Sequence, residues 1–208
     1  MRGVDTSPVA VAIVLNTRPE SIPKELNALV EAASSAGAAL AGTVQTENIG
    51  IEKIVCNIVA NPNIRYLVLG GPESEGHITG DALRKLILKG VDGNGRIIDT
   101  QAPNPKLLNL PAVYIERFRR QVSLIDLQFE GDPELMEQAV RACQGNAATT
   151  FREYRLADPG PYPEAPLGGK IEWSVEQPWA EPEDDAERAA VKRAKEMMDR
   201  LRRKHQKK

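Results

Sequence analysis

The sequence predicts an α/β fold, a parallel β-sheet covered by helices. Short apolar segments, of which Val9–Leu15 is the clearest, alternate along the chain with longer segments whose apolar residues recur every three or four positions. The short segments are too apolar to leave one face in water, as is typical of parallel strands buried on both faces. The 208 residues, 41% hydrophobic and 27% charged, suffice for one sizeable core.

The first half of the pattern alternates three strands with two helices. Ser21 offers an N-cap for the first helix and Pro23 a residue of its first turn, and Gly37 ends it. The second helix carries apolar residues at helical spacing from Ile51 onward, and Pro62 ends it. The strands are expected at residues 9–15, 38–44 and 65–70.

The second half repeats this alternation after a glycine-rich loop. The remaining elements are expected in this order: a helix from about residue 82 to Gly90, a turn at 92–95, a loop over 99–110, a helix from Pro111, a strand at 122–127 and a helix from Asp132 to Gly145. The turn lacks the closing glutamate of a calcium-binding loop, so we interpret it as a plain turn.

The chain divides into three predicted parts. Residues 1–146 carry the strand–helix alternation, and residues 147–183 are rich in Pro and Gly, with a strand candidate at 171–175. Residues 184–208 predict a charged helix that begins acidic and ends basic, as the helix dipole favours. This helix is either a solvated surface helix or a docking element for a partner protein. Nucleic-acid binding ranks third because no aromatic residue is interleaved with the basic ones.

Composition and charge exclude several classes of protein. The 27 Lys and Arg against 29 Asp and Glu give a net charge of −2, which offers no global reason to expect a nucleic acid or an anionic lipid as partner. Val9–Leu15 is the longest apolar run, far below the ~20 residues of a membrane span, and no secretory signal precedes it. Cys56 and Cys143 lie far apart, which predicts reduced thiols in the core and a cytoplasmic protein.

Two polar loops are expected at one edge of the sheet. Thr46-Glu47-Asn48 follows the second predicted strand, and Gly70–Gly80 follows the third. Open parallel sheets bind ligands at the carboxyl ends of their strands, where glycines let a bulky ligand reach the backbone. His77 lies in the second loop. A lone imidazole there suits one axial position of a metal held by a macrocycle, whereas a zinc site requires three or four protein ligands.

Other interpretations of these loops stay open. Glycine-rich loops between strand and helix are common in this architecture, and Thr46 then only caps its helix. The glycines do not have the G-x-G-x-x-G spacing of dinucleotide sites, and no P-loop motif occurs. Glu73 and Glu75 are either acid–base groups or solvated carboxylates. His205 lies in the basic tail and is expected at the surface.

Longer motifs are more specific than a glycine pattern. They read TENIGIEKIV at 46–55, NPNIR at 61–65, GHITG at 76–80 and RFRRQVSLIDL at 117–127. Together they closely resemble the corrinoid-binding A subunit of tetrahydromethanopterin S-methyltransferase. The resemblance covers about residues 5–145.

The resemblance implies a Rossmann-like domain that holds a cobamide, a corrinoid of the vitamin B12 type, with His77 as the lower axial ligand of its cobalt. It implies a methyl carrier that receives the methyl group of a methyl-tetrahydropterin through a partner methyltransferase subunit of the H type and passes it to a thiol or another acceptor. We expect the corrin rim to be held by the surrounding loop residues, Thr46, Glu47, Asn48, Gly71, Glu73, Gly76, Thr79 and Gly80.

Two features depart from the family pattern. The proteins of this family usually end in a transmembrane helix, whereas this chain ends in a Lys/Arg-rich segment, and residues 99–110 diverge. We therefore expect a soluble paralogue without the anchor. Two alternatives remain: a non-catalytic binding or regulatory module, and a small enzyme that acts on a phosphorylated metabolite in the same pocket with Glu73 or Glu75 as its base.

Overall fold

The computed structural model describes residues 1–17, 22–146 and 149–151, together with residues 185, 188, 189, 192, 193 and 196. Contacts divide the chain into two units, Met1–Tyr162 and Pro163–Lys208, and the fold below belongs to the first. Its elements are, in chain order, β1 (Val9–Val14), α1 (Lys24–Ser35), β2 (Leu40–Val44), α2 (Ile49–Ala60), β3 (Tyr66–Gly71), α3 (Thr79–Lys89), α4 (Ala112–Gln121), β4 (Ser123–Gln128) and α5 (Pro133–Gly145).

The four strands form one parallel sheet in the order β2-β1-β3-β4. In its register, Ala12 of β1 lies between Gly42 of β2 and Leu69 of β3. The predicted α/β class with a parallel sheet is therefore confirmed. Because all four strands run the same way, their carboxyl ends meet at one edge, where the loops that follow β2 and β3 lie on either side of the end of β1.

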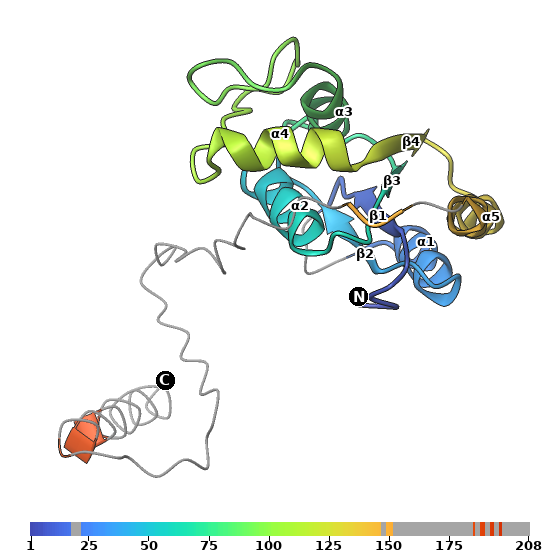
Figure 1. The fold of residues 1–208 in the computed structure, drawn as a ribbon, viewed down its shortest axis with the longest axis horizontal. Helices are drawn as coiled ribbons and strands as arrows, with labels where there is room; N and C mark the ends of the chain where they lie inside the picture. The colour runs from blue at the N-terminus through green and yellow to red at the C-terminus, as the bar shows by residue number, and fades with distance from the viewer. Residues whose placement is uncertain are drawn as a thin grey trace, which may run out of the picture. The chain divides into compact units, whose positions relative to one another are not determined.

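Helices cover both faces of the sheet (Figure 1). Alternate side chains of β1 enter different cores, since successive strand residues point to opposite faces. Val9, Val11 and Ile13 pack with α1 and α5, whereas Ala10, Ala12 and Val14 pack with α2, α3 and α4. Cys143 is buried in the first core, where burial raises the pKa of its thiol, and the partly buried Cys56 packs against the second.

Two local details differ from the sequence prediction. Pro23 is the N-cap of α1 rather than a residue of its first turn and makes no side-chain cap, while the predicted cap residue Ser21 lies outside the described residues. β4 is an edge strand whose Ser123 and Asp126 are exposed, so it is not buried on both faces as the apolar pattern suggested.

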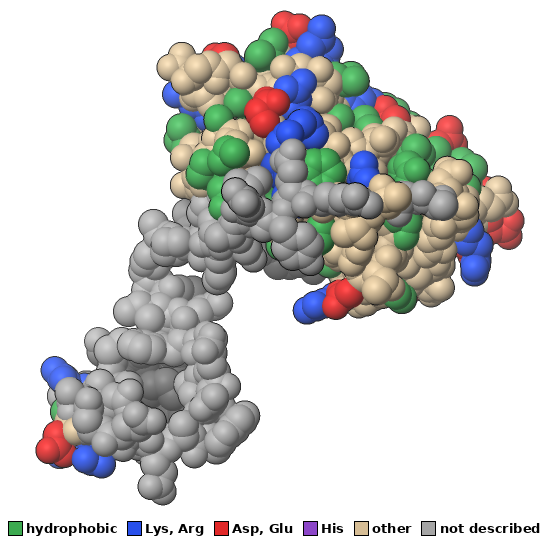
Figure 2. All heavy atoms as spheres, viewed as in Figure 1, with side chains coloured by type: hydrophobic (Ala, Val, Ile, Leu, Met, Phe, Trp, Pro, Cys, Tyr) green, Lys and Arg blue, Asp and Glu red, His purple; other side chains and the backbone are tan. Residues whose placement is uncertain are grey.

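The surface agrees with the near-neutral composition. On the face that Figure 2 shows, Lys and Arg side chains lie interspersed with Asp and Glu over the described part of the domain. None of the described helices is long and apolar enough to cross a membrane.

The chain beyond α5 returns to the amino edge of the sheet. The Phe151 N–H donates to the Pro62 carbonyl oxygen. The Phe151 ring lies against two guanidinium groups: its centroid is 4.4 Å from Cζ of Arg117 and 5.5 Å from Cζ of Arg65. Residues 149–151 are thus held by the folded domain. The rest of the predicted Pro/Gly-rich extension and most of the predicted charged helix lie outside the described residues.

Candidate functional site

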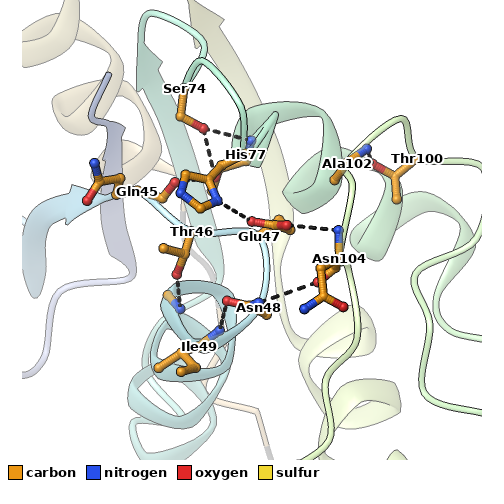
Figure 3. A network of polar contacts seen from close by, with 12 residues as sticks. Gln45, Thr46, Glu47, Asn48, Ile49, Ser74, His77, Thr100, Ala102 and Asn104 are labelled. Atoms are coloured by element: carbon orange, nitrogen blue, oxygen red, sulfur yellow. Dashed lines mark hydrogen bonds and ion pairs between the residues drawn. The ribbon is translucent and has the colours of Figure 1, made fainter. Parts of the chain in front are cut away.

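The loops that follow β2 and β3 meet at the carboxyl edge of the sheet (Figure 3). His77 Nδ1 lies 2.7 Å from Glu47 Oε2. The His77 side chain is 42% exposed, whereas that of Glu47 is 2% exposed, so a buried carboxylate holds a half-exposed ring. Among the residues that the structure describes, no side chain or backbone group bonds to the second ring nitrogen, Nε2. The arrangement offers one oriented imidazole nitrogen to a ligand.

The second oxygen of the Glu47 carboxylate is also occupied. Glu47 Oε1 accepts a hydrogen bond of 2.9 Å from the backbone N–H of Asn104, which belongs to the long loop between α3 and α4. Asn48 Nδ2 lies 3.5 Å from the Asn104 carbonyl oxygen, so Asn104 contacts both Glu47 and Asn48. Burying a carboxylate is costly unless it is hydrogen-bonded, and the Asn104 N–H and the His77 ring compensate the burial of Glu47. Glu47 therefore links the ring of His77 to the α3–α4 loop.

The segment that carries His77 is tied to the end of β2. Ser74 Oγ accepts from the Thr79 N–H (3.0 Å) and pairs with Thr79 Oγ1 (2.8 Å). Thr79 Oγ1 in turn donates to the Gln45 carbonyl oxygen (2.6 Å). Ile78, directly after His77, has a φ of 51° in the left-handed region, where a β-branched residue is strained. Surrounding bonds overcome this strain and fix the path of the loop.

Three of the predicted site residues lie at the start of α2 or on the open side of the loop. Thr46 Oγ1 accepts from the Gly50 N–H (2.9 Å) and Asn48 Oδ1 from the Ile49 N–H (2.7 Å), so both stabilise the first turn of α2. Gly76 is exposed, and a Cβ built on it would meet nothing within 4 Å. Two of these three residues thus cap α2, and the third leaves open space beside the backbone that leads to His77.

The other predicted residues face the protein interior. Thr79 and Gly80 are buried, and Glu73 accepts hydrogen bonds from backbone N–H groups. Gly71 has a φ of +84°, and a Cβ there would lie 2.6 Å from the Val14 carbonyl oxygen, so only glycine fits where β3 passes β1. The structure thus brings His77 and Glu47 into contact and uses Glu73, Thr79 and Gly80 to build the loop.

Sequence reasoning missed four residues of this network: Gln45, Ser74, Asn104 and Gln128. Gln45 directly follows β2, and Gln128 is the last residue of β4. A polar residue at the carboxyl end of a strand was a usable signal for Gln128, whose side chain contacts Glu73. Gln45 and Asn104 carried none, because they contact Thr79 and Glu47 through their backbone.

A family comparison decides the evolutionary assignment. The model of the family MtrA, the A subunit of tetrahydromethanopterin S-methyltransferase, matches residues 9–157, which include every strand and helix described in the first unit. The chain belongs to this family. The resemblance that the motifs predicted is confirmed.

Three similar relatives carry the same family description. The tetrahydromethanopterin S-methyltransferase A subunit 2 of Methanothermobacter thermautotrophicus is 43% identical over 142 residues, 68% of this chain and 72% of the relative. The A subunit 1 of Methanothermobacter marburgensis is 40% identical over 152 residues, 73% of this chain but only 59% of the relative. For the A subunit of Methanocaldococcus jannaschii the identity is 44% over 116 residues, 55% of this chain and 48% of the relative.

Proposed function

We propose that this member of the MtrA family is a corrinoid methyl carrier in which His77 Nε2 is the lower axial ligand of cobalt. One observation carries the proposal: a half-exposed imidazole whose Nδ1 is held 2.7 Å from the buried carboxylate of Glu47. Metal-ligating histidines generally donate their other ring N–H to a carboxylate or carbonyl, which fixes the tautomer and the ring orientation. The donor set therefore fits a metal that takes one ligand from the protein and the others from a macrocycle.

When bound, a cobamide supplies a cobalt centre that accepts and releases a methyl group. The residues of the chain supply the rest. Glu47 keeps the proton on Nδ1, so that the Nε2 lone pair faces the ligand. Thr46 and Asn48 flank Glu47 in sequence and Gly76 precedes His77, so these are the residues we expect against the rim of the macrocycle. Gly71, Glu73, Thr79 and Gly80 support the loop from inside.

The substrates and the partner are proposed from the family. The relatives are named as subunits of tetrahydromethanopterin S-methyltransferase. We propose that the methyl group comes from a methyl-tetrahydropterin through a separate methyltransferase subunit of the H type and passes to a thiol or another acceptor.

Cobalamin binding tests the proposal. Purified protein incubated with cobalamin under reducing conditions is expected to form a stoichiometric coloured complex, and its cobalt(II) EPR spectrum should show nitrogen hyperfine splitting. His77→Ala should lose the splitting. His205→Ala is the matched control, because it removes the other histidine of the chain. Absence of corrinoid binding in the wild type, or splitting that persists in His77→Ala, would overturn the proposal.

The rival enzyme had two candidate bases, Glu73 and Glu75. A base needs a free carboxylate, whereas both Glu73 oxygens accept N–H groups, so Glu75, which is exposed, is the candidate base left to this rival. If the protein is a regulatory module, it should take up no methyl group after reconstitution with cobalamin.

A pull-down of the partner methyltransferase with and without residues 184–208 tests docking through this segment, and unchanged recovery would exclude it.

A further inference from the structure

Glu73 closes the segment that carries His77. Its Oε1 accepts from the N–H of Ser74 (2.9 Å) and of Gly80 (2.8 Å), and its Oε2 accepts from the Asp81 N–H (3.0 Å). Ser74 begins the segment, and Gly80 and Asp81 follow its end. One carboxylate therefore joins the entry and the exit of residues 74–79.

The same carboxylate also caps helix α3. The first N–H groups of a helix have no partner within the helix, and the N-cap residue of α3, Ile78, makes no side-chain cap. Glu73 supplies the missing acceptor for two of these groups, those of Gly80 and Asp81. A negative charge at this position is also favoured by the helix dipole.

Gln128 braces Glu73 from β4. Its Nε2 donates to Glu73 Oε2 (3.2 Å) and to the Pro72 carbonyl oxygen (3.4 Å). Gln128 is 8% exposed, and its Oε1 is a buried acceptor without a partner in the described part of the chain. Rotating the amide would turn Oε1 toward the carboxylate, so the unpaired oxygen is the cost of keeping the donor on Glu73.

Gly80 makes room for this brace. A Cβ at residue 80 would lie 2.1 Å from Gln128 Nε2, so only a glycine lets the amide lie against the helix start. The last glycine of the GHITG motif is thus explained by packing within the loop.

We propose that Glu73, braced by Gln128, is a positioning residue for His77. It fixes both ends of the loop and the strained Ile78 between them, while Glu47 fixes the ring. The backbone of the loop is held rigid, and the imidazole is presented in one orientation. The part of this proposal that concerns cobalt rests on the proposed function, whereas the part that concerns the ring does not.

The cobamide-free protein gives the first test. In the wild type, the Gly80 and Asp81 amides should be protected from hydrogen exchange and His77 should give one sharp set of ring NMR signals. Glu73→Gln places an amide nitrogen against two of the N–H donors, because each oxygen of Glu73 accepts from two. We expect faster exchange at the helix start and broadened or multiple His77 signals. Should Glu73→Gln fail to fold, Gln128→Ala removes the brace and leaves the carboxylate.

The cobalamin complex gives the second test. Glu73→Gln should weaken cobalamin binding about tenfold, as does loss of a group that orients a metal ligand, and should make the nitrogen splitting heterogeneous. Glu75→Gln removes an exposed carboxylate of the same loop and should bind like the wild type. Asp132→Ala removes a cap far along the chain, the 2.9 Å bond from the Glu134 N–H, and controls for general destabilisation.

The outcomes separate the two proposals. If the wild type binds no cobalamin, the proposed function fails, and the His77 ring signals still decide the positioning role. If Glu73→Gln keeps single, sharp ring signals and wild-type affinity, or if Asp132→Ala disturbs His77 equally, the positioning role of Glu73 is refuted.

Discussion

The contact between His77 and Glu47 makes a quantitative prediction for Glu47→Gln. This substitution keeps the shape of the side chain but removes the charge from two partly buried hydrogen bonds, which the carboxylate accepts from His77 Nδ1 (2.7 Å) and from the Asn104 N–H (2.9 Å). Hydrogen bonds to a charged group contribute about 1.5–3 kcal/mol and neutral ones about 0.5–1.5 kcal/mol. We therefore expect a loss of about 2 kcal/mol in the free energy of unfolding, by difference. Cobalamin affinity should fall about tenfold or more, which is about 1.4 kcal/mol in binding free energy.

The chain offers a matched control in Glu52→Gln. Glu52 is a buried carboxylate in the first turn of helix α2. It accepts from the N–H (2.9 Å) and the Nδ2 (2.8 Å) of Asn109 without touching His77. Urea unfolding should show similar losses for both variants, whereas only Glu47→Gln should lower cobalamin affinity in a spectroscopic titration. In a His205→Ala background, ¹⁵N NMR of the remaining ring should show a changed tautomer balance in Glu47→Gln alone. Equal cobalamin affinity in the two variants would refute the orienting role of Glu47.

Three further predictions concern the fold. Gly71→Ala should unfold at clearly lower urea concentration than Gly76→Ala. Both glycines have positive φ, which costs an alanine about 1–2 kcal/mol, but only at residue 71 would the new Cβ also lie 2.6 Å from a carbonyl oxygen. Equal midpoints would contradict this. Phe151→Ala should cost about 1 kcal/mol in unfolding free energy through its two guanidinium contacts, and an unchanged midpoint would show that residues 149–151 are not held. Two backbone N–H groups lower the pKa of Asp92, so its contribution to the free energy of unfolding is present above the ordinary carboxyl range and is lost as pH falls through the lowered pKa. Asp92→Asn should therefore flatten the fall of stability at acidic pH, and an unchanged slope would contradict this prediction.

The strands and helices were predictable because burial leaves a strong mark on the sequence. Val9–Val14 is apolar throughout since both of its faces are covered, and α1 and α5 show helical spacing because each buries one face. β4 was predicted less accurately. Its edge position depends on the strand order, which no local pattern encodes.

The candidate site was predictable in its location and not in its contacts. His77 and Glu47 follow two strands of one parallel sheet, which predicts a common edge. Their pairing requires β2 and β3 to flank β1, and this order follows only from tertiary packing. Glu73 was expected to face a ligand. Its role as a cap of α3 was not predictable, because its spacing to the start of the helix matches no capping motif. The cap exists because the chain loops back over five intervening residues before α3 begins.

Three buried or partly buried carboxylates at or beside the candidate site share one physical role. Glu47, Glu52 and Glu73 each accept at least one backbone N–H from another loop or from a helix start. A buried charge is tolerated only when such donors compensate it, so the acidic residues stabilise irregular backbone that no sheet or helix ladder satisfies. An apolar residue at any of the three positions would leave an N–H group unpaired. The acidic character of the site therefore follows from the need to fix its loops, and His77 is its half-exposed nitrogen base because those loops are fixed around it.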